Sequence, residues 1–243
     1  MIKRIILIFF LPVLLVSFVN GQNQKFKPEW NVGVGFGPTF SSVDFQSGKL
    51  GVQLNTKNKQ QFHGGIAIRY MTEKNLGIIA ELNYSQQGWE ENFDKNSGSD
   101  GAATGEDRGF SHSHQLNYLE LPLLTHIYFG RKVRFFINLG PKLSYLMSDS
   151  ETMSDQLFNY IGSGEASANT ETHQYFRKAE KKIDYGLMGG LGLEFRTGIG
   201  NFSLEGRYTF GLGDIYNNAK ADHFSRSANR VISAKLTYYV KLF

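Results

Sequence analysis

Apolar and polar side chains alternate along segments of about ten or more residues, and tight turns and long polar loops join these segments in turn. A period of two places successive side chains on opposite faces of an extended strand. In membrane-spanning β-barrels, lipid contacts one face of each strand and the lumen contacts the other. The pattern therefore predicts an all-β, eight-stranded, antiparallel up-and-down transmembrane β-barrel.

Eight segments carry this alternation. We expect strands over residues 30–40, 62–70, 76–85, 114–129, 133–147, 182–196 and 202–212, and a last strand that follows the loop at 214–227 and ends at residue 243. Tight turns are expected at 74–75, 130–132 and 197–200, and long loops at 90–113 and 148–181. The long loops then lie at one end of the barrel, and both chain termini lie with the tight turns at the other. Short turns are typical of the periplasmic end and longer loops of the extracellular end.

Two prolines interrupt the predicted ladder, Pro122 and Pro141. Proline has no backbone donor, so each is expected to mark a bulge or a weak point of the sheet. The loop 90–113 is rich in Gly, Ser, Asp, Asn and Glu, and we expect it to be mobile and outside the membrane.

The first residues are typical of an export signal. Lys3 and Arg4 precede an apolar run from residue 5 to residue 19, and small side chains follow it. The run is shorter than the roughly 20 apolar residues of a membrane-spanning helix, and no later run is longer. We expect a signal peptide over residues 1–21, cleaved after Gly21, and an outer-membrane β-barrel domain over residues 22–243. A retained anchor is the alternative.

Composition excludes several classes of protein. The net charge is +4 and the sequence pI about 9.1, but the basic residues are scattered, so nucleic acid is not an expected partner. There is no cysteine, and hence neither a disulfide nor a cysteine metal site. Twelve Tyr, twenty Phe and 27 Gly fit a barrel with aromatic girdles and close strand contacts.

The strands of a soluble eight-stranded barrel would also alternate between apolar and polar side chains, but with the apolar face inward. The aromatic-rich apolar set and the export signal favour lipid outside. In that case charged residues of both signs fill a lumen only wide enough for side chains. They must pair with one another or with trapped water, because an unpaired buried charge is costly, so no open channel is expected. The predicted lumen set is Arg69, Glu81, Glu120, Arg134, Lys142, Asp184, Glu194, Arg196, Glu205, Arg207 and Lys235, with Lys241 at the end of the last strand.

No catalytic, cofactor-binding or metal-binding residues are predicted. Glu194 and Glu205 resemble an acid and base pair, but Arg196 and Arg207 beside them are expected to keep both carboxylates ionised and structural. Glycines at 33, 35 and 37 and at 186, 189, 190 and 192 lie within strands, with no helix to receive a phosphate. We expect them to admit large neighbours inside a narrow barrel.

Histidine can act as a metal ligand or as part of a hydrolytic site, and four histidines stand at positions of interest. His112 and His114 form a His-x-His pair in the predicted loop, flanked by serines, but without a third ligand or an orienting acid. His63 and His126 occupy lumen positions and are expected to be hydrogen-bonded core residues.

Five stretches resemble the PorT-like outer-membrane β-barrel family (outer membrane protein β-barrel domain). They are residues 81–88 (ELNYSQQG), 118–124 (YLELPLL), 138–142 (NLGPK), 184–194 (DYGLMGGLGLE) and 205–212 (EGRYTFGL). The resemblance implies an eight-stranded barrel in the outer membrane of a Gram-negative bacterium, inserted by the barrel-assembly machinery. It implies no enzymatic activity and no cofactor.

Three functions are compatible with these features. The first is a structural or interaction barrel, surrounded by outer-membrane lipid, whose long loops contact an envelope protein or surface ligand. The second is a small passive porin-like channel, which requires a continuous water path through the charged lumen. An accessory role in a protein-secretion apparatus is a variant implied by the resemblance. The third is an enzyme at the outer rim that uses Ser, His and an acid, and we do not expect it.

Overall fold

The computed structural model describes residues 26–47, 54–93, 108–163, 173–218 and 223–242. The predicted signal peptide, Phe243 and residues 94–107 of the loop 90–113 lie outside these ranges. The described elements are β1 (Glu29–Ser47), β2 (Thr56–Lys57), β3 (Lys59–Glu73), β4 (Leu76–Glu91), β5 (His112–Gly130), β6 (Val133–Met153), α2 (Asp155–Gly162), β7 (Ile183–Thr197), β8 (Gly200–Gly211) and β9 (Phe224–Lys241). Within the described residues, no helix has the length and apolar character needed to cross a membrane.

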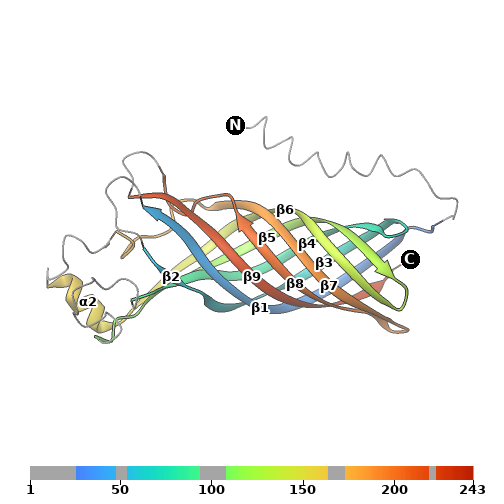
Figure 1. Ribbon diagram of the computed structural model, residues 1–243, viewed down its shortest axis with the longest axis horizontal. Helices are drawn as coiled ribbons and strands as arrows, with labels where there is room; N and C mark the ends of the chain where they lie inside the picture. The colour runs from blue at the N-terminus through green and yellow to red at the C-terminus, as the bar shows by residue number, and fades with distance from the viewer. Residues whose placement is uncertain (1–25, 48–53, 94–107, 164–172, 219–222, 243) are drawn as a thin grey trace.

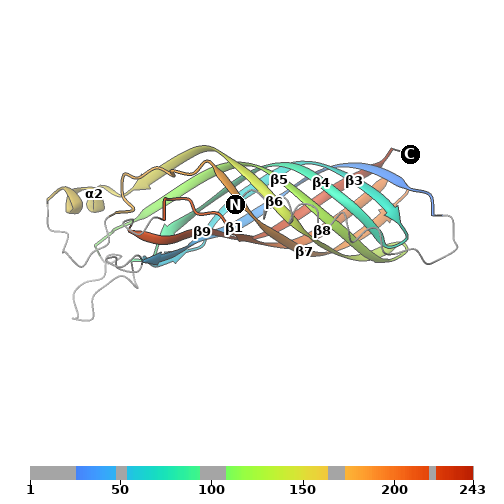
Figure 2. The same cartoon turned by 90° about the horizontal axis from the view of Figure 1, so that it is seen from above.

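The strands form one antiparallel sheet that closes on itself, in the order β2-β4-β3-β1-β9-β8-β7-β6-β5 with a further pairing of β4 to β5. The two-residue β2 pairs with the same strand as its neighbour β3, so eight long strands make the wall. Figures 1 and 2 show the resulting long cylinder of tilted strands. The predicted eight-stranded up-and-down barrel is confirmed.

The two ends of the cylinder differ. The tight turns fall at 74–75, 131–132 and 198–199, as predicted, and Asn75 takes a positive φ of 73°, which Asn adopts more readily than most residues. Near these turns the backbone N–H of Leu242 donates to the carbonyl of Trp30, 2.8 Å away. We call this the turn end. Helix α2 lies at the opposite, loop end (Figure 1).

Several strands extend further toward the loop end than the sequence predicts. β4 continues to Glu91, β5 begins at His112, β6 continues to Met153 and β9 begins at Phe224. Outward positions on these extensions carry polar side chains such as Gln115, Ser150 and Thr152. Water, not lipid, contacts such positions, so the apolar alternation ends before the strand does, and the predicted loop boundaries were wrong for that reason.

The prolines mark a weak point but no bulge. Pro122 pairs with Lys142, and the next pair of that ladder is Thr125 with Leu139, so both strands advance by the same three residues across the gap. Pro141 itself pairs with Leu187 of β7. The register shift between β5 and β6 falls between Asn117 and Tyr118, so of the two expected alternatives the weak point, and not the bulge, applies to the prolines.

Large apolar side chains point outward along the wall. Val34, Phe62 and Leu139 are about 60% exposed, whereas inward Glu194 and Lys235 are fully buried. A soluble barrel has the reverse arrangement, because water must contact its polar face. The outer surface is therefore suited to hydrocarbon, and the polar interior is closed off from it.

Glycine permits close contact of the strands that seal the barrel. A Cβ placed on Gly37 of β1 would lie 1.8 Å from the carbonyl oxygen of Ala234 in β9. Backbone cannot yield as a flexible side chain does, so only glycine fits here. The aromatic ring of Tyr239 similarly occupies the space that a Cβ on Gly33 would need, 2.6 Å away. At Gly33 the predicted role of admitting a large neighbour is confirmed, whereas at Gly37 the glycine admits the backbone of the neighbouring strand.

Gly37→Ala should destabilise the barrel by about 1–3 kcal/mol, because the added methyl forces β1 and β9 apart. Gly206→Ala is the matched control, since a Cβ on Gly206 meets no atom within 4 Å and should change stability by less than about 0.5 kcal/mol. Urea unfolding of the detergent-refolded barrels, followed by tryptophan fluorescence, measures both. Equal stability of the two variants would contradict the close-contact account.

Candidate functional site

Ten of the eleven predicted lumen residues are buried, five basic and five acidic, so their formal charges cancel. They come from seven of the eight long strands and meet along the axis of the barrel. The buried residues are Arg69, Arg134, Lys142, Arg207 and Lys235, with Glu81, Glu120, Asp184, Glu194 and Glu205.

A central cluster of Glu81, Glu205, Arg207 and Lys235 occupies the middle of the lumen. The guanidinium of Arg207 donates to both carboxylate oxygens of Glu81, at 2.7 and 2.8 Å, and to Glu205 at 2.7 Å. Lys235 donates to Glu81 at 2.8 Å. Bidentate, charge-assisted bonds are the strongest that a side chain makes, and here they cross the lumen between β4, β8 and β9.

Two further groups of ion pairs flank the central cluster. Toward the turn end, Glu194 pairs with Arg69 and, at 3.2 Å, with Arg134. Toward the loop end, Lys142 donates to Glu120 at 2.6 Å. Asp184 accepts a bond from the Asn229 amide at 3.1 Å.

Arg196 and Lys241 do not belong to the buried set. Arg196 is exposed at the turn end, where its guanidinium lies 3.8 Å from Glu29, and Lys241 lies 3.3 Å from the same carboxylate. The alternation that predicted an inward Arg196 extends to the turn end of β7, where the lumen is no longer filled by side chains and an inward position is open to water. The prediction that Arg196 is a lumen residue was therefore wrong.

The predicted lumen histidines are both buried but differ in their bonding. His126 Nδ1 lies 2.7 Å from Asn138 Oδ1. Neither ring nitrogen of His63 is hydrogen-bonded to any described residue, contrary to the prediction. His63 lines a lumen cavity of about 10 Å³, which has room for about one water molecule.

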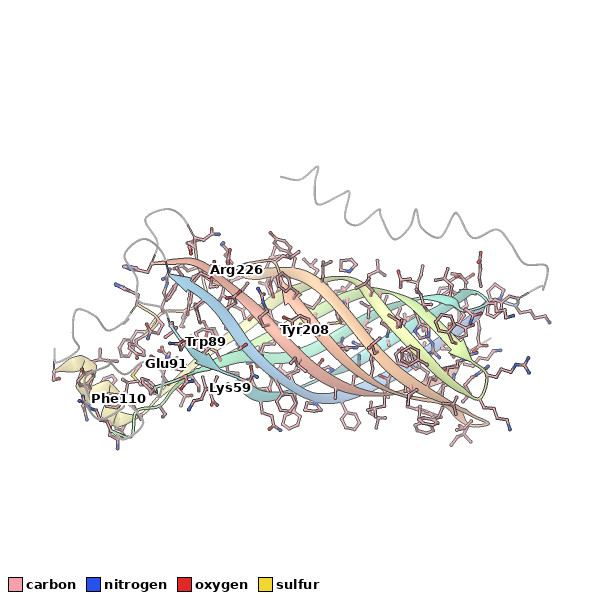
Figure 3. All side chains as sticks on the ribbon, in the orientation of Figure 1. Lys59, Trp89, Glu91, Phe110, Tyr208 and Arg226 are labelled. Carbon is pink, nitrogen blue, oxygen red and sulfur yellow. The ribbon has the colours of Figure 1, made fainter. Side chains whose placement is uncertain are left out.

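An aromatic plug, made by Phe45, Trp89, Tyr118, Tyr216 and Phe224 with aliphatic neighbours, fills the lumen on the loop side of the ion pairs. Phe45 packs edge-on against Trp89, with ring centroids 5.2 Å apart, and tilts against Phe224 at 5.0 Å. Trp89, a residue of β4, lies toward the loop end of the barrel (Figure 3). These residues do not stand out in the sequence, because an inward aromatic breaks the polar pattern of the lumen face.

Beyond the plug lies a histidine cluster of Glu91, His112, His114, Asp149 and Glu151. The predicted loop position of the two histidines was wrong: both lie on β5 and are 1–2% exposed. His112 Nε2 lies 2.9 Å from Glu151 and its Nδ1 lies 3.2 Å from Glu91, while His114 Nδ1 lies 2.8 Å from Asp149. The third ligand and the orienting acid that the sequence lacks beside the histidines come from other strands: Glu91 lies on the extension of β4, and Asp149 and Glu151 lie on the extension of β6.

Charge in the histidine cluster favours a cation. Burial opposes protonation of His112, but its hydrogen bond to Glu151 and the negative charges of Glu91 and Glu151 raise the pKa of the imidazole above its usual value. Burial disfavours the charged form of Glu151, yet bonds from His112 and from the backbone N–H of Phe176 lower the pKa of this carboxyl. The cluster therefore favours an ionised Glu151 beside His112.

A pocket of about 310 Å³ adjoins this cluster. It is lined by both polar and aromatic side chains from β2, β4, β5 and β6, including Lys57, Glu91, Phe110 and His112. Figure 3 shows Glu91 and Phe110 toward the same end of the molecule as α2.

Exposed aromatic rings gather on the loop end around α2. Phe158 and Phe176 are 56% and 63% exposed and meet edge to face, with centroids 6.0 Å apart. Phe176 has a φ of +57°, which is rare for a bulky residue. Its N–H donates to both oxygens of Glu151 at 3.1 Å, which offsets the strain.

An apolar outer wall, an ion-paired interior and a closed antiparallel ring define a membrane-spanning β-barrel of the outer-membrane class. The family model described as outer membrane protein beta-barrel domain matches residues 20–217. The chain belongs to this family. A Gram-negative outer membrane is its location.

Several solved structures are similar to this chain. Ail, the attachment invasion locus protein of Yersinia pestis, is 13% identical with a TM-score of 0.40, over 87% of this chain and 99% of that one. The outer membrane protein OprG of Pseudomonas aeruginosa is 14% identical with a TM-score of 0.47, over 86% and 95%. E. coli outer membrane protein W is 14% identical with a TM-score of 0.36, over 89% and 100%. No curated protein matches significantly.

Arg207→Met should destabilise the barrel by about 3–5 kcal/mol, because it leaves Glu81 and Glu205 with too little positive charge in a buried site. Arg196→Met removes an exposed pair and should cost less than about 1 kcal/mol. The heat-induced shift in gel mobility and the urea midpoint of each refolded variant measure the difference. A similar loss of stability in the two variants would show that burial does not make the central ion pairs more important than the exposed pair.

Proposed function

We propose that this protein is a closed, non-conducting outer-membrane barrel whose loop end binds an envelope protein or a surface ligand. Closure is supported by the cancelling ion pairs, by the aromatic plug and by a lumen cavity of about 10 Å³. A passive channel would need a continuous water path past the ion pairs and the aromatic plug, and a cavity that holds about one water molecule is too small to provide it. In this proposal the protein is not an enzyme, since Arg and Lys pair with the lumen carboxylates.

The observation that carries the interaction role is the exposed pair Phe158 and Phe176. Phe158 belongs to α2, which lies beyond the end of the barrel wall (Figure 1), and Phe176 packs against Phe158, so lipid around the wall does not account for their exposure. Exposed aromatics that are held in a fixed arrangement are typical anchors of protein interfaces. The bond from Phe176 N–H to Glu151 ties this surface to the rigid end of β6.

Narrower statements about the protein's biology belong to the same proposal. A signal peptide over residues 1–21 would direct export, and the barrel-assembly machinery would insert the chain with the loop end outside. The PorT-like assignment, with an accessory role in protein secretion, is supported by the five matching stretches. Four of these lie wholly within β4, β5, β6 and β7, and the fifth runs along β8 to Leu212 just after it.

Purified wild-type protein in a planar bilayer should give no stable single-channel current, because no water path crosses the ion pairs and the plug. A porin reconstituted in the same membrane serves as the control for detection. A reproducible current through the wild type, absent from mock-reconstituted bilayers, would overturn the closed-barrel proposal.

A photo-crosslinking amino acid at position 158 should give a discrete adduct with a protein or surface polymer in intact outer membranes. Phe176→Ser should reduce that adduct, because it removes half of the aromatic pair. The same crosslinker at the lipid-facing position 208 is the matched control, since Tyr208 is exposed on the outer wall. Identical adducts from 158 and 208, or none from 158, would argue against a loop-end partner.

A further inference from the structure

Three side chains of the histidine cluster converge like the ligands of a metal ion. His112 and His114 are two apart on β5, so they share the inward face, and Glu151 pairs directly with His114 across the β5–β6 ladder. One nitrogen of each imidazole and one oxygen of Glu151 lie within 4.8 Å of one another. The sheet itself therefore brings three ligand atoms together on a rigid frame.

Both ring nitrogens of His114 are available as metal ligands. The residue is 1% exposed, yet neither Nδ1 nor Nε2 makes a hydrogen bond of good geometry. Asp149 Oδ1 is 2.8 Å from Nδ1 and also lacks a hydrogen bond, because the two groups are not aligned as donor and acceptor. Burying unbonded polar atoms is costly, and a cation between them would remove that cost.

We propose that His112, His114 and Glu151 bind a divalent transition-metal ion such as Zn²⁺ at the mouth of the barrel. Two imidazoles and a carboxylate suit zinc and its neighbours in the first transition series, whereas calcium and magnesium prefer sites made wholly of oxygen. Glu91 and Asp149 lie close enough to join as a further ligand or to orient the imidazoles. Their negative charge also attracts a cation.

The surroundings hold the ligands in place, as outer partners do in known metal sites. The indole of Trp89 stacks on the His114 ring, with centroids 4.5 Å apart and planes 3° from parallel. The N–H of Phe176 donates to Glu151, and the Tyr175 hydroxyl donates to Glu91 at 3.2 Å. A bound metal would therefore connect β5 and β6 to the segment that carries the exposed aromatic pair.

An ion can reach the site from solution. The pocket of about 310 Å³ is lined by His112 and Glu91. Outward neighbours on these strand extensions, such as Gln115 and Thr152, are polar, which places the cluster beyond the hydrocarbon. The metal proposal does not depend on a closed lumen or on a protein partner, and each of those proposals fails or stands separately.

Calorimetric titration of the detergent-refolded, untagged barrel with Zn²⁺ tests the proposal. The expected result is one saturable site, weakened at least about tenfold by His114→Gln and by Glu151→Gln, which preserve side-chain size. The matched control is the double variant His173→Ala/His223→Ala, because these two imidazoles stack on each other, with ring centroids 3.2 Å apart, and neither is a proposed ligand. This control should leave the affinity unchanged.

Trp89 supplies a readout that does not depend on heats of binding. The chain has two tryptophans, so Trp30→Phe leaves Trp89 as the only one. Cu²⁺ should then quench its fluorescence saturably, since the metal would sit beside the stacked His114 ring, and Zn²⁺ should compete with that quenching. Heat-modifiable gel mobility verifies that each variant is folded.

Three results would overturn the proposal. They are no saturable Zn²⁺ binding by the folded wild type, unchanged affinity in folded His114→Gln and Glu151→Gln, and loss of binding in the His173→Ala/His223→Ala control. If the glutamine variants fail to fold, Cu²⁺ quenching of Trp89 in the folded Trp30→Phe barrel decides the question, and its absence rejects the site.

Discussion

Charge pairing in a narrow lumen is the interaction on which this barrel depends. Eight strands leave space only for side chains, so each charged group inside must find its partner inside. Arg207 shows how this is achieved, because its guanidinium bonds to Glu81 and Glu205 from two sides while Lys235 supplies the remaining positive charge. The membrane-facing side of the wall is left free to be apolar, because the charges of the membrane-spanning strands lie in the lumen, where most of them meet an opposite charge. The same arrangement of side chains thus stabilises the barrel and gives it an apolar outer surface that suits a membrane.

The interior changes character along the axis, and the change has functional consequences. Ion pairs occupy the membrane-spanning part, an aromatic plug follows, and a buried histidine cluster lies at the mouth. An aromatic layer between two polar ones separates the lumen from the outside, which favours a binding role over transport. In the proposed function the binding surface is the loop end, where the strands extend past the apolar alternation and β6 leads into α2.

The loop end is tied together more firmly than a set of independent loops would be. Glu151 accepts bonds from His112 and from Phe176 N–H, and Glu91 accepts from Tyr175. Residues distant in sequence therefore depend on the same two carboxylates. A ligand that binds the histidine cluster would act on the exposed aromatic surface through these carboxylates, because they are shared by both.

The sequence alone determined the barrel, its strand order, its turns and the inward charges, because a period of two needs no knowledge of partners to assign faces. Arg207 and Glu81 are examples, whereas Arg196 obeys the same period but lies past the closed part of the wall. Only the tertiary structure decided which charges meet, where the plug lies and that His112 and His114 acquire Glu91 and Glu151. Glu91 lies 21 residues before His112 and Glu151 lies 39 residues after it, both on strand extensions where the apolar pattern has ended. Pairing across a closed sheet is a property of register that a local pattern does not contain.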